Sequence, residues 1–449
     1  MKKKFIKLFI PLAILNTSLF AADHLDPSHS SPKNLLQVFQ IASKDNADYQ
    51  AALATYQANK QNIPISLGAL LPNINLQAAI QYNKTDPTDS GNKSSYTTIN
   101  PTNPMITVSQ SIFDWGLWKT YSQSQYQFKA DAITLAQNRQ QLILNTATAY
   151  FNILQAKDQL KFAKANLNWN KELFEQSEQK FKVGISAITD VQSSKANYEN
   201  SIASSISAEN SLQSAYNKLQ QITGKEIQHI IELSNKFPFE PPQPESASAW
   251  VKVALTSNLD LIKSQFDIEA KKAAISVSWG TFIPSITLVG TINKSYNYQS
   301  KDTTKTSTVG TVGLNASWNI LNGGSDIATV KQNEYITKSA KLSRKQVTLN
   351  TSSEVTQSYL TVLADIAQVK ALKQSVLANE SSVKAMKAGY NVGTQTIVDL
   401  LQRQQILFDT QKQYADAKYS YINDYLTLKQ RAGNLTIKDI ENINKWLIK

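Results

Sequence analysis

Two aspartates, Asp190 and Asp399, occupy the same place in a stretch that the chain uses twice. Residues 181–191 read FKVGISAITDV and residues 390–400 read YNVGTQTIVDL, at an offset of 209. A carboxylate near a helix N-terminus is stabilised by the helix macrodipole, and a ring of carboxylates in a pore favours cations over anions. The chemistry that these acids offer is therefore electrostatic rather than covalent.

Helical hairpins are the elements expected to position these acids. A glycine after the last apolar-periodic residue is a common left-handed helix stop, and Gly184 and Gly393 fit that role. Ser186 and Thr394 follow them and are expected to cap the free N–H groups of the next helix. Long apolar-periodic runs flank each copy, so each copy is predicted to be the tip of a hairpin.

The usual catalytic and metal-binding residue sets are missing from the sequence. There is no cysteine, and imidazole is available only from His24, His29 and His229. No Ser/His/Asp set, paired histidines at helical spacing or phosphate-cradling glycine loop appears. We therefore expect no enzymatic activity, no metal site and no cofactor.

The first 21 residues resemble a secretory signal peptide. Lysines at positions 2–4 precede an apolar run that ends before Ala22, and Pro11 and Asn16 interrupt that run. The net charge of the chain is +12, which would suit an exported nucleic-acid-binding protein. No basic cluster with interleaved aromatics appears, so we interpret the charge as a solvated surface and expect no nucleic acid partner.

An internal two-fold repeat extends well beyond the hairpin tips. Tyr150 matches Tyr359 and Gly224 matches Gly433 at the same offset of 209. The predicted division is a signal peptide at 1–21, a first repeat at 35–224, a linker at 225–247, a second repeat at 248–433 and a short polar tail at 434–449.

Each repeat is predicted to contribute two amphipathic strands. Apolar and polar residues alternate at about 72–83 and 104–114, and again at about 284–293 and 309–320. Polar segments at 84–103 and about 294–308 are expected to be exposed loops between the strands of each pair. Such alternation suits a soluble sandwich or strands that span an outer membrane.

Long helices account for most of the remaining chain. Residues 35–67 have a helical pattern, and large apolar residues recur every seven positions from Ile153 to Phe181 and from Val362 to Tyr390. The run from Leu117 to Lys182 would be roughly 100 Å long as a helix. No ordinary globular domain needs a helix of that length.

Four strands cannot close a membrane barrel alone, because such barrels begin at eight strands and an open edge in lipid is costly. Two copies would supply eight strands and three copies twelve. The predicted fold class is an α+β membrane protein, whose barrel continues into a tube of packed helical hairpins.

Several runs make the sequence similar to the TolC family of outer-membrane export ducts. The likeness extends from about residue 35 to 433 and is carried by QSIFD (110–114), ILNTATAYFN (143–152), VGISAITDVQ (183–192), QITG (221–224) and AGYNVGTQTIVDL (388–400). The resemblance implies a homotrimer, with a 12-stranded barrel in outer-membrane lipid and a 12-helix tunnel in the periplasm. It also implies a periplasmic adaptor and an inner-membrane transporter as partners, in drug efflux or type I protein secretion.

The resemblance assigns roles to the residues at the tips. An adaptor would contact Gly184, Ile185, Gly393 and Thr394, although both glycines also fit the plain role of helix caps. Asp399 would line the closed entrance as a ring of three acids; alternatively, it is only a helix N-terminal acid. Gln402 stands where the family usually has a second aspartate, so a weaker cation block is expected.

Two polar links close the entrance in the family, and only the first matches this chain. Tyr390 would donate its hydroxyl proton to Asp190, beside Thr189, unless Tyr390 simply packs in the helical seam. The positions of the second link hold Gln395, Lys387 and Leu173, so its charged pair is missing.

A soluble periplasmic coiled-coil scaffold or adaptor is the alternative function. It would explain the long helices but gives no reason for four amphipathic strands with polar segments between them.

Overall fold

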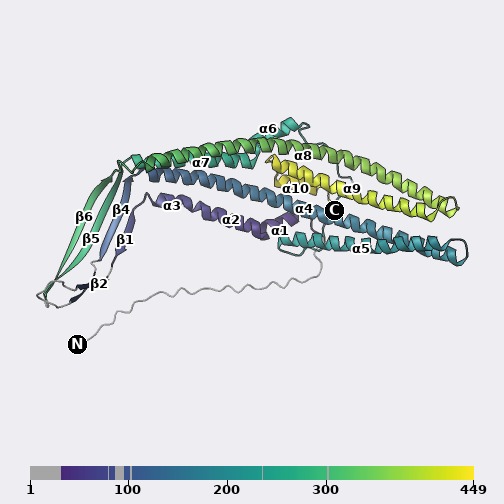
Figure 1. Ribbon diagram of the computed structural model, residues 1–449, viewed down its shortest axis with the longest axis horizontal. Coiled ribbons are helices and arrows are strands. Elements are labelled where there is room, and N and C mark those ends of the chain that lie inside the picture. Colours follow the sequence, from purple (N-terminus) through teal and green to yellow (C-terminus); the bar gives the residue numbers. More distant parts are fainter. Residues whose placement is uncertain are drawn as a thin grey trace, which may run out of the picture.

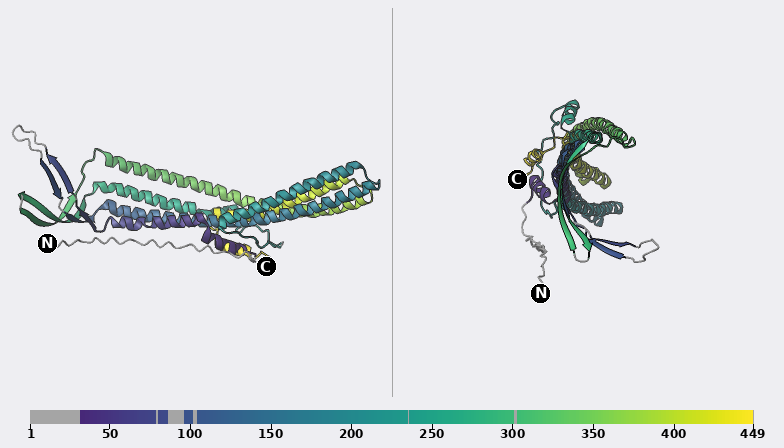
Figure 2. Two further views of the ribbon diagram at one scale, coloured as in Figure 1. Left: turned by 90° about the horizontal axis from the view of Figure 1, so that it is seen from below. Right: turned by 90° about the vertical axis from the view of Figure 1, so that its left-hand side faces the viewer.

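The computed structural model describes residues 32–78, 80–85, 96–101, 104–234, 236–300 and 303–448. The predicted signal peptide, His24 and His29 lie outside these residues. The elements are arranged along one long axis, with a sheet at one end and the turns of two helical hairpins at the other (Figure 1). Seen along that axis, helices and sheet follow a single arc (Figure 2).

Two very long helices form the frame, as the heptad patterns predict. Helix α4 (Trp115–Lys182) has 68 residues and α8 (Ser325–Asn391) has 67. Asp114 caps α4 by accepting a hydrogen bond from the Leu117 N–H at 2.9 Å. Each long helix turns back at its tip into a shorter one, α5 (Ile188–Thr223) or α9 (Ile397–Arg431), and packs along it.

The first helical stretch differs from the prediction of one continuous pattern at 35–67. It is divided into α1 (Leu35–Asp45), α2 (Ala47–Lys60) and α3 (Asn62–Gly68). The break at Asn46 arises because this residue adopts an extended conformation and caps α2, accepting from the Tyr49 N–H at 2.9 Å. The second repeat has a matching break between α6 (Ala247–Ser257) and α7 (Leu259–Trp279).

Two buried asparagines join helices end to end, and we call them the asparagine joints. The Asn46 side-chain amide donates to the Ile222 carbonyl at the end of α5 at 2.9 Å. Asn258 caps α7 and donates to the Arg431 carbonyl at the end of α9 at 2.8 Å. These contacts align α2 with α5, and α7 with α9, so that each pair forms one column beside the long helices.

The main sheet is antiparallel, with the strand order β1-β4-β5-β6. Its strands pair in the registers Leu76↔Ile106, Val108↔Gly290 and Gly290↔Val312. The bounds are β1 (Asn73–Gln77), β4 (Met105–Phe113), β5 (Ser285–Ser300) and β6 (Thr303–Ser317), with β2 (Ile80–Thr85) and β3 (Tyr96–Pro101) forming a separate two-stranded sheet.

The predicted polar loops are therefore partly wrong. Most of the segment at about 294–308 continues β5 and β6, which stay paired to Ser300↔Thr303. Within 84–103, residues 84–85 and 96–101 belong to β2 and β3. Polar composition did not exclude strands here, because a two-stranded ribbon can satisfy its backbone hydrogen bonds in polar sequence as well as in apolar sequence.

The main core lies midway along the molecule, where α1, the linker and the C-terminal segment pack on the long helices. The tail predicted as merely polar contains α10 (Ile437–Asn444), which buries Ile440 and Ile443. Asp439 forms a capping box at the start of α10 and an ion pair with Lys429. In Figure 1 the C-terminus lies at this central level. A 3-10 turn, η1 (Gly280–Phe282), leads from α7 into β5.

None of the helices in the described residues combines the length and the hydropathy needed to cross a membrane.

Candidate functional site

The two hairpin tips are built as the sequence predicts, on glycines with positive φ. Gly184 has φ +78° and Gly393 has φ +80°. The chain reverses through hydrogen bonds from the Ile185 N–H to the Lys180 carbonyl, 2.8 Å, and from the Thr394 N–H to the Gly389 carbonyl, 2.9 Å. A side chain at either glycine would be strained by this backbone conformation, although the space around both is open.

The predicted helix caps after these turns are wrong. Thr394 donates its hydroxyl back to the Gly389 carbonyl at 3.1 Å, and Thr396 caps α9 instead. Ser186 donates to the Asp190 carboxylate at 2.7 Å, while Ala187 is the residue before α5 and has no capping side chain. The cap position lies one residue after Ser186 in the first turn and two residues after Thr394 in the second, because both turns are longer than the capping prediction assumed.

The tips present apolar side chains to solvent. Val183, Ile185 and Val392 are 67%, 76% and 76% exposed. An exposed apolar group at the extreme end of a hairpin contributes nothing to the core of its own chain, so it is available for contact with another surface.

A small apolar cluster behind the tips joins the two hairpins, and we call it the tip cluster. Leu173 of α4 packs with Ile397, Leu400 and Leu401 of α9, all buried. Trp169, Met386 and Tyr390 pack against this group. Leu173 holds one of the positions that the resemblance assigns to the second polar link, and in this chain that position packs in an apolar cluster.

Tyr390 and Asp190, the predicted latch pair, interact with other partners in this structure. Asp190 accepts the Ser186 hydroxyl, and the described residues include no hydrogen bond between Tyr390 and Asp190. Tyr390 instead lies under the Lys180 ammonium, whose Nζ is 4.0 Å from the ring centroid. Lys180 belongs to α4 and Tyr390 to α8, so this cation–π contact also connects the two hairpins.

The remaining latch positions lie at the surface or near it. Thr189 and Gln395 are exposed, and Lys387 is half-buried and forms no ion pair within the described part of the chain. The Gln395 side chain covers Gly389, where an added Cβ would be 2.7 Å from the Gln395 Cγ. A side chain at position 389 would therefore displace the Gln395 side chain from its present position.

The predicted gate residues lie in the first two turns of α9. Asp399 is exposed, accepts the Thr396 hydroxyl at 2.6 Å and donates its own N–H to that oxygen at 3.2 Å. Gln402 is exposed one turn further along. The α8–α9 hairpin therefore offers the Asp399 carboxylate at its tip, held in place by the helix cap.

Sequence comparison assigns the chain to a family. The model described as "Outer membrane efflux protein" matches residues 38–225 and 250–434. The chain belongs to the outer membrane efflux protein family. The two matched segments coincide with the two helical hairpins and their strands.

Individual members of the outer membrane efflux protein family are similar over nearly the whole chain. Outer membrane protein TolC of Escherichia coli K12 is 31% identical, over 94% of this chain and 86% of that protein. The alkaline protease secretion protein AprF of Pseudomonas aeruginosa is 23% identical, over 91% of this chain and 86% of that protein. The outer membrane channel CmeC of Campylobacter jejuni has a TM-score of 0.76 at 20% identity, over 99% and 98% of the two chains, so it shares the fold.

Two features of this member of the outer membrane efflux protein family were not predicted. The asparagine joints had a detectable signal, because Asn46-x-Asp48 and Asn258-x-Asp260 each precede an apolar-periodic run. Lys180 had none, because a lysine near a helix C-terminus is ordinary. Within the described residues, no group of three or more His, Asp or Glu side chains could hold a metal ion.

Proposed function

We propose that the protein is the outer-membrane exit duct of tripartite export machinery, a passive channel that serves multidrug efflux, type I protein secretion or both. It works as a homotrimer with a 12-stranded barrel in the outer membrane and a helical tunnel in the periplasm. Its partners are a periplasmic adaptor and an inner-membrane transporter. Its gate lies at the hairpin tips.

One observation carries this proposal, namely a four-stranded sheet that is open at both edges and apolar on its surface. β1 and β6 each pair on one side only. Ile74, Val312 and Leu314 of these edge strands are 72%, 82% and 71% exposed. Exposed apolar side chains suit lipid, whereas open strand edges are costly there unless further strands close the sheet. Copies of this chain supply such strands.

The repeated design supports the trimer. The two repeats of one chain give two long helices and two columns, so three copies give the twelve helical parts of the tunnel that the family resemblance implies. Membership of an efflux family and likeness to AprF, a secretion protein, support both export roles.

The first test is the mass of the protein extracted in mild detergent. We expect three times the mass of one subunit, and steady conductance when the preparation is added to a planar bilayer. A stable single subunit would contradict the channel, and two subunits would indicate an eight-stranded barrel.

The adaptor role of the tips is tested separately. Ile185→Asp replaces an exposed apolar side chain at the tip, and Gly184→Trp adds bulk there. Both variants should reduce export while the trimer still assembles. The matched control is Leu255→Asp, an exposed apolar residue of α6 away from the tips. Normal export by both tip variants would exclude this contact.

A soluble periplasmic scaffold is the alternative. It would leave the protein in the soluble fraction after osmotic shock, whereas the proposed duct requires detergent. The exposed apolar residues of the sheet favour the duct.

A further inference from the structure

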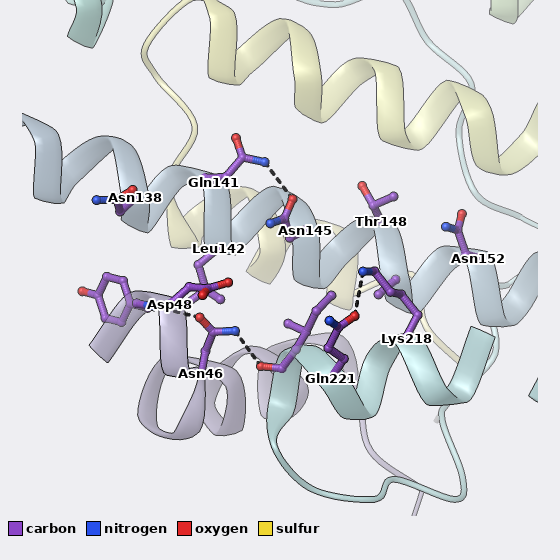
Figure 3. Close-up of a pocket in the computed structure, with 13 residues that line it drawn as sticks. Asn46, Asp48, Asn138, Gln141, Leu142, Asn145, Thr148, Asn152, Lys218 and Gln221 are labelled. Atoms are coloured by element: carbon purple, nitrogen blue, oxygen red, sulfur yellow. Dashed lines mark hydrogen bonds between the residues drawn. The ribbon is translucent and has the colours of Figure 1, made fainter. Parts of the chain in front are cut away.

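The two asparagine joints lie beside two cavities that occupy equivalent places in the repeats. The cavity at Asn46, of about 510 Å³, lies between the start of α2, the end of α5 and one face of α4. Figure 3 shows Asn138, Gln141 and Asn145 along α4, with Asn46 and Gln221 across from this helix and Gln141 hydrogen-bonded to Asn145. The cavity at Asn258, of about 610 Å³, lies between the start of α7, the end of α9 and α8.

The walls of these cavities correspond residue by residue. Val347, Asn350 and Glu354 of α8 line the second cavity, and Asn138, Gln141 and Asn145, each 209 positions earlier, line the first. Gln430 and Gln221 are related in the same way. Asp260 and Asp48 are related by 212, the spacing of the joints themselves.

The second cavity has one wall that the first lacks. Gln137 and Gln141 of α4 close it from the far side. Gln137 donates to the Asp260 carboxylate at 2.6 Å, and Gln430 donates to Gln141 at 2.8 Å. The α7/α9 column thus lies between two long helices, α8 and α4, whereas the α2/α5 column packs mainly along α4 and touches α9 through α5.

Burial differs between the columns accordingly. Helix α7 buries Leu261, Ile268, Ala270, Ala273 and Ser278, whereas α2 and α3, its counterparts, bury no residue. Phe151 of α4 is fully buried, but its counterpart Leu360 of α8 is 51% exposed. Leu342 of α8 is likewise 60% exposed. The exposed face of α8 and the exposed side of the α2/α5 column therefore correspond to the two surfaces that are in contact where α4 packs on the α7/α9 column.

We propose that α8 of a second copy of this chain supplies the missing wall of the cavity at Asn46. It packs on the α2/α5 column in the same register in which α4 packs on the α7/α9 column. Gln346, 209 positions after Gln137, then donates to the partner subunit's Asp48. Asn350, the counterpart of Gln141, pairs with the partner subunit's Gln221. Asp48 forms no hydrogen bond or ion pair within the described residues of its own chain, so its carboxylate is available.

The proposed contact joins two different surfaces, so each copy offers α8 to one neighbour and its α2/α5 column to the other. Contacts of this kind generate a closed ring when the rotation between copies permits. The inference rests on the proposed oligomeric duct and adds the partner residues and their register.

Cross-linking tests the register directly, because the chain has no cysteine of its own. The full-length Asp48→Cys/Gln346→Cys variant is treated in mild detergent with a short bifunctional thiol reagent and run on a denaturing gel. The positive control is Gln137→Cys/Asp260→Cys, the equivalent pair within one chain. The register control is Asp48→Cys/Ser353→Cys, two helical turns away on α8.

We expect the Asp48/Gln346 variant to run at two- and three-subunit positions and the Gln137/Asp260 variant to stay at one, with at least a tenfold weaker product for the register control. A second pair, Gln221→Cys/Asn350→Cys, gives an independent measurement if the first variant folds poorly. If the protein has the mass of three subunits but neither intersubunit cysteine pair cross-links, the proposed register is wrong while the oligomeric duct stands. A one-subunit mass would overturn the oligomeric duct together with it.

Discussion

At the scale of single residues, Lys180 and Tyr390 hold the two hairpins together at the tip. A cation–π contact of this kind is worth about 0.5–1 kcal/mol at a partly exposed site. Lys180→Met removes the charge and keeps the length of the side chain, so it should favour the open entrance and raise single-channel conductance in a planar bilayer. Tyr390→Phe keeps the ring and should change conductance less. If Tyr390→Phe and Asp190→Ala both raise conductance and Lys180→Met does not, the hydroxyl link to Asp190 closes the entrance instead.

Asp399 is the second residue with a proposed role at the entrance. In the proposed trimer its exposed carboxylate would form a single ring of acids, and a ring of acids attracts cations. Asp399→Asn should remove most of the block of the pore by a multivalent cation, and Gln402→Asp should strengthen the block by adding a second ring one turn further in. Asp409→Asn, an exposed acid further along α9, is the matched control. If the block is unchanged in Asp399→Asn, Asp399 serves only as an acid at the N-terminus of its helix.

At the scale of elements, the asparagine joints stabilise the columns. Asn46→Ala removes both a helix cap and a buried hydrogen bond to the end of α5. It should destabilise the first turn of α2 by about 2 kcal/mol, since each interaction contributes about 1 kcal/mol. Ser246→Ala removes only a cap, that of α6, and should cost about 1 kcal/mol. Hydrogen exchange of the first-turn amides measures both, and equal losses would show that the joint adds nothing.

The α8–α9 hairpin contains a pair of acids that makes its stability depend on pH. Burial, and then the neighbouring Asp424, raise the pKa of Asp365 to about 6. The unfolded chain has an ordinary aspartate pKa near 4, so between about pH 4 and 6 the folded state binds more protons. Stability should therefore fall as pH rises through this window and stay low above it. Asp365→Asn should flatten the dependence and raise the unfolding temperature at pH 7, unlike Glu334→Gln, an exposed acid of α8. A pH profile unaltered by Asp365→Asn would contradict this assignment.

At the scale of the whole molecule, periodicity predicted the long helices and the glycine tips, because heptads and left-handed stops are local signals. The partner of Tyr390 could not be predicted, since it depends on how α4 and α8 meet at the tip. The continuation of β5 and β6 into polar sequence was missed for a related reason. Strand pairing there depends on the neighbouring strand rather than on apolar alternation.

The C-terminal segment shows the same limit, because its polar composition hid a helix that ties the repeats together at the central level. The Ser234 N–H donates to the Trp446 carbonyl, 2.9 Å, and the Ile448 N–H to the Glu232 carbonyl, 2.8 Å, so the tail pairs with the linker. Ile440 of α10 is fully buried in the main core.

Ile440→Ala should therefore destabilise the protein by about 2–5 kcal/mol, the usual cost of such a truncation in a core. Glu441→Ala changes the adjacent exposed residue and should have almost no effect. The measurement is the temperature at which each variant loses its detergent-stable oligomer. We expect a clear drop for Ile440→Ala alone, because the linker and tail brace both repeats where their columns are joined. Equal temperatures for the two variants would mean that α10 is a peripheral attachment and that the long helices hold the central level without it.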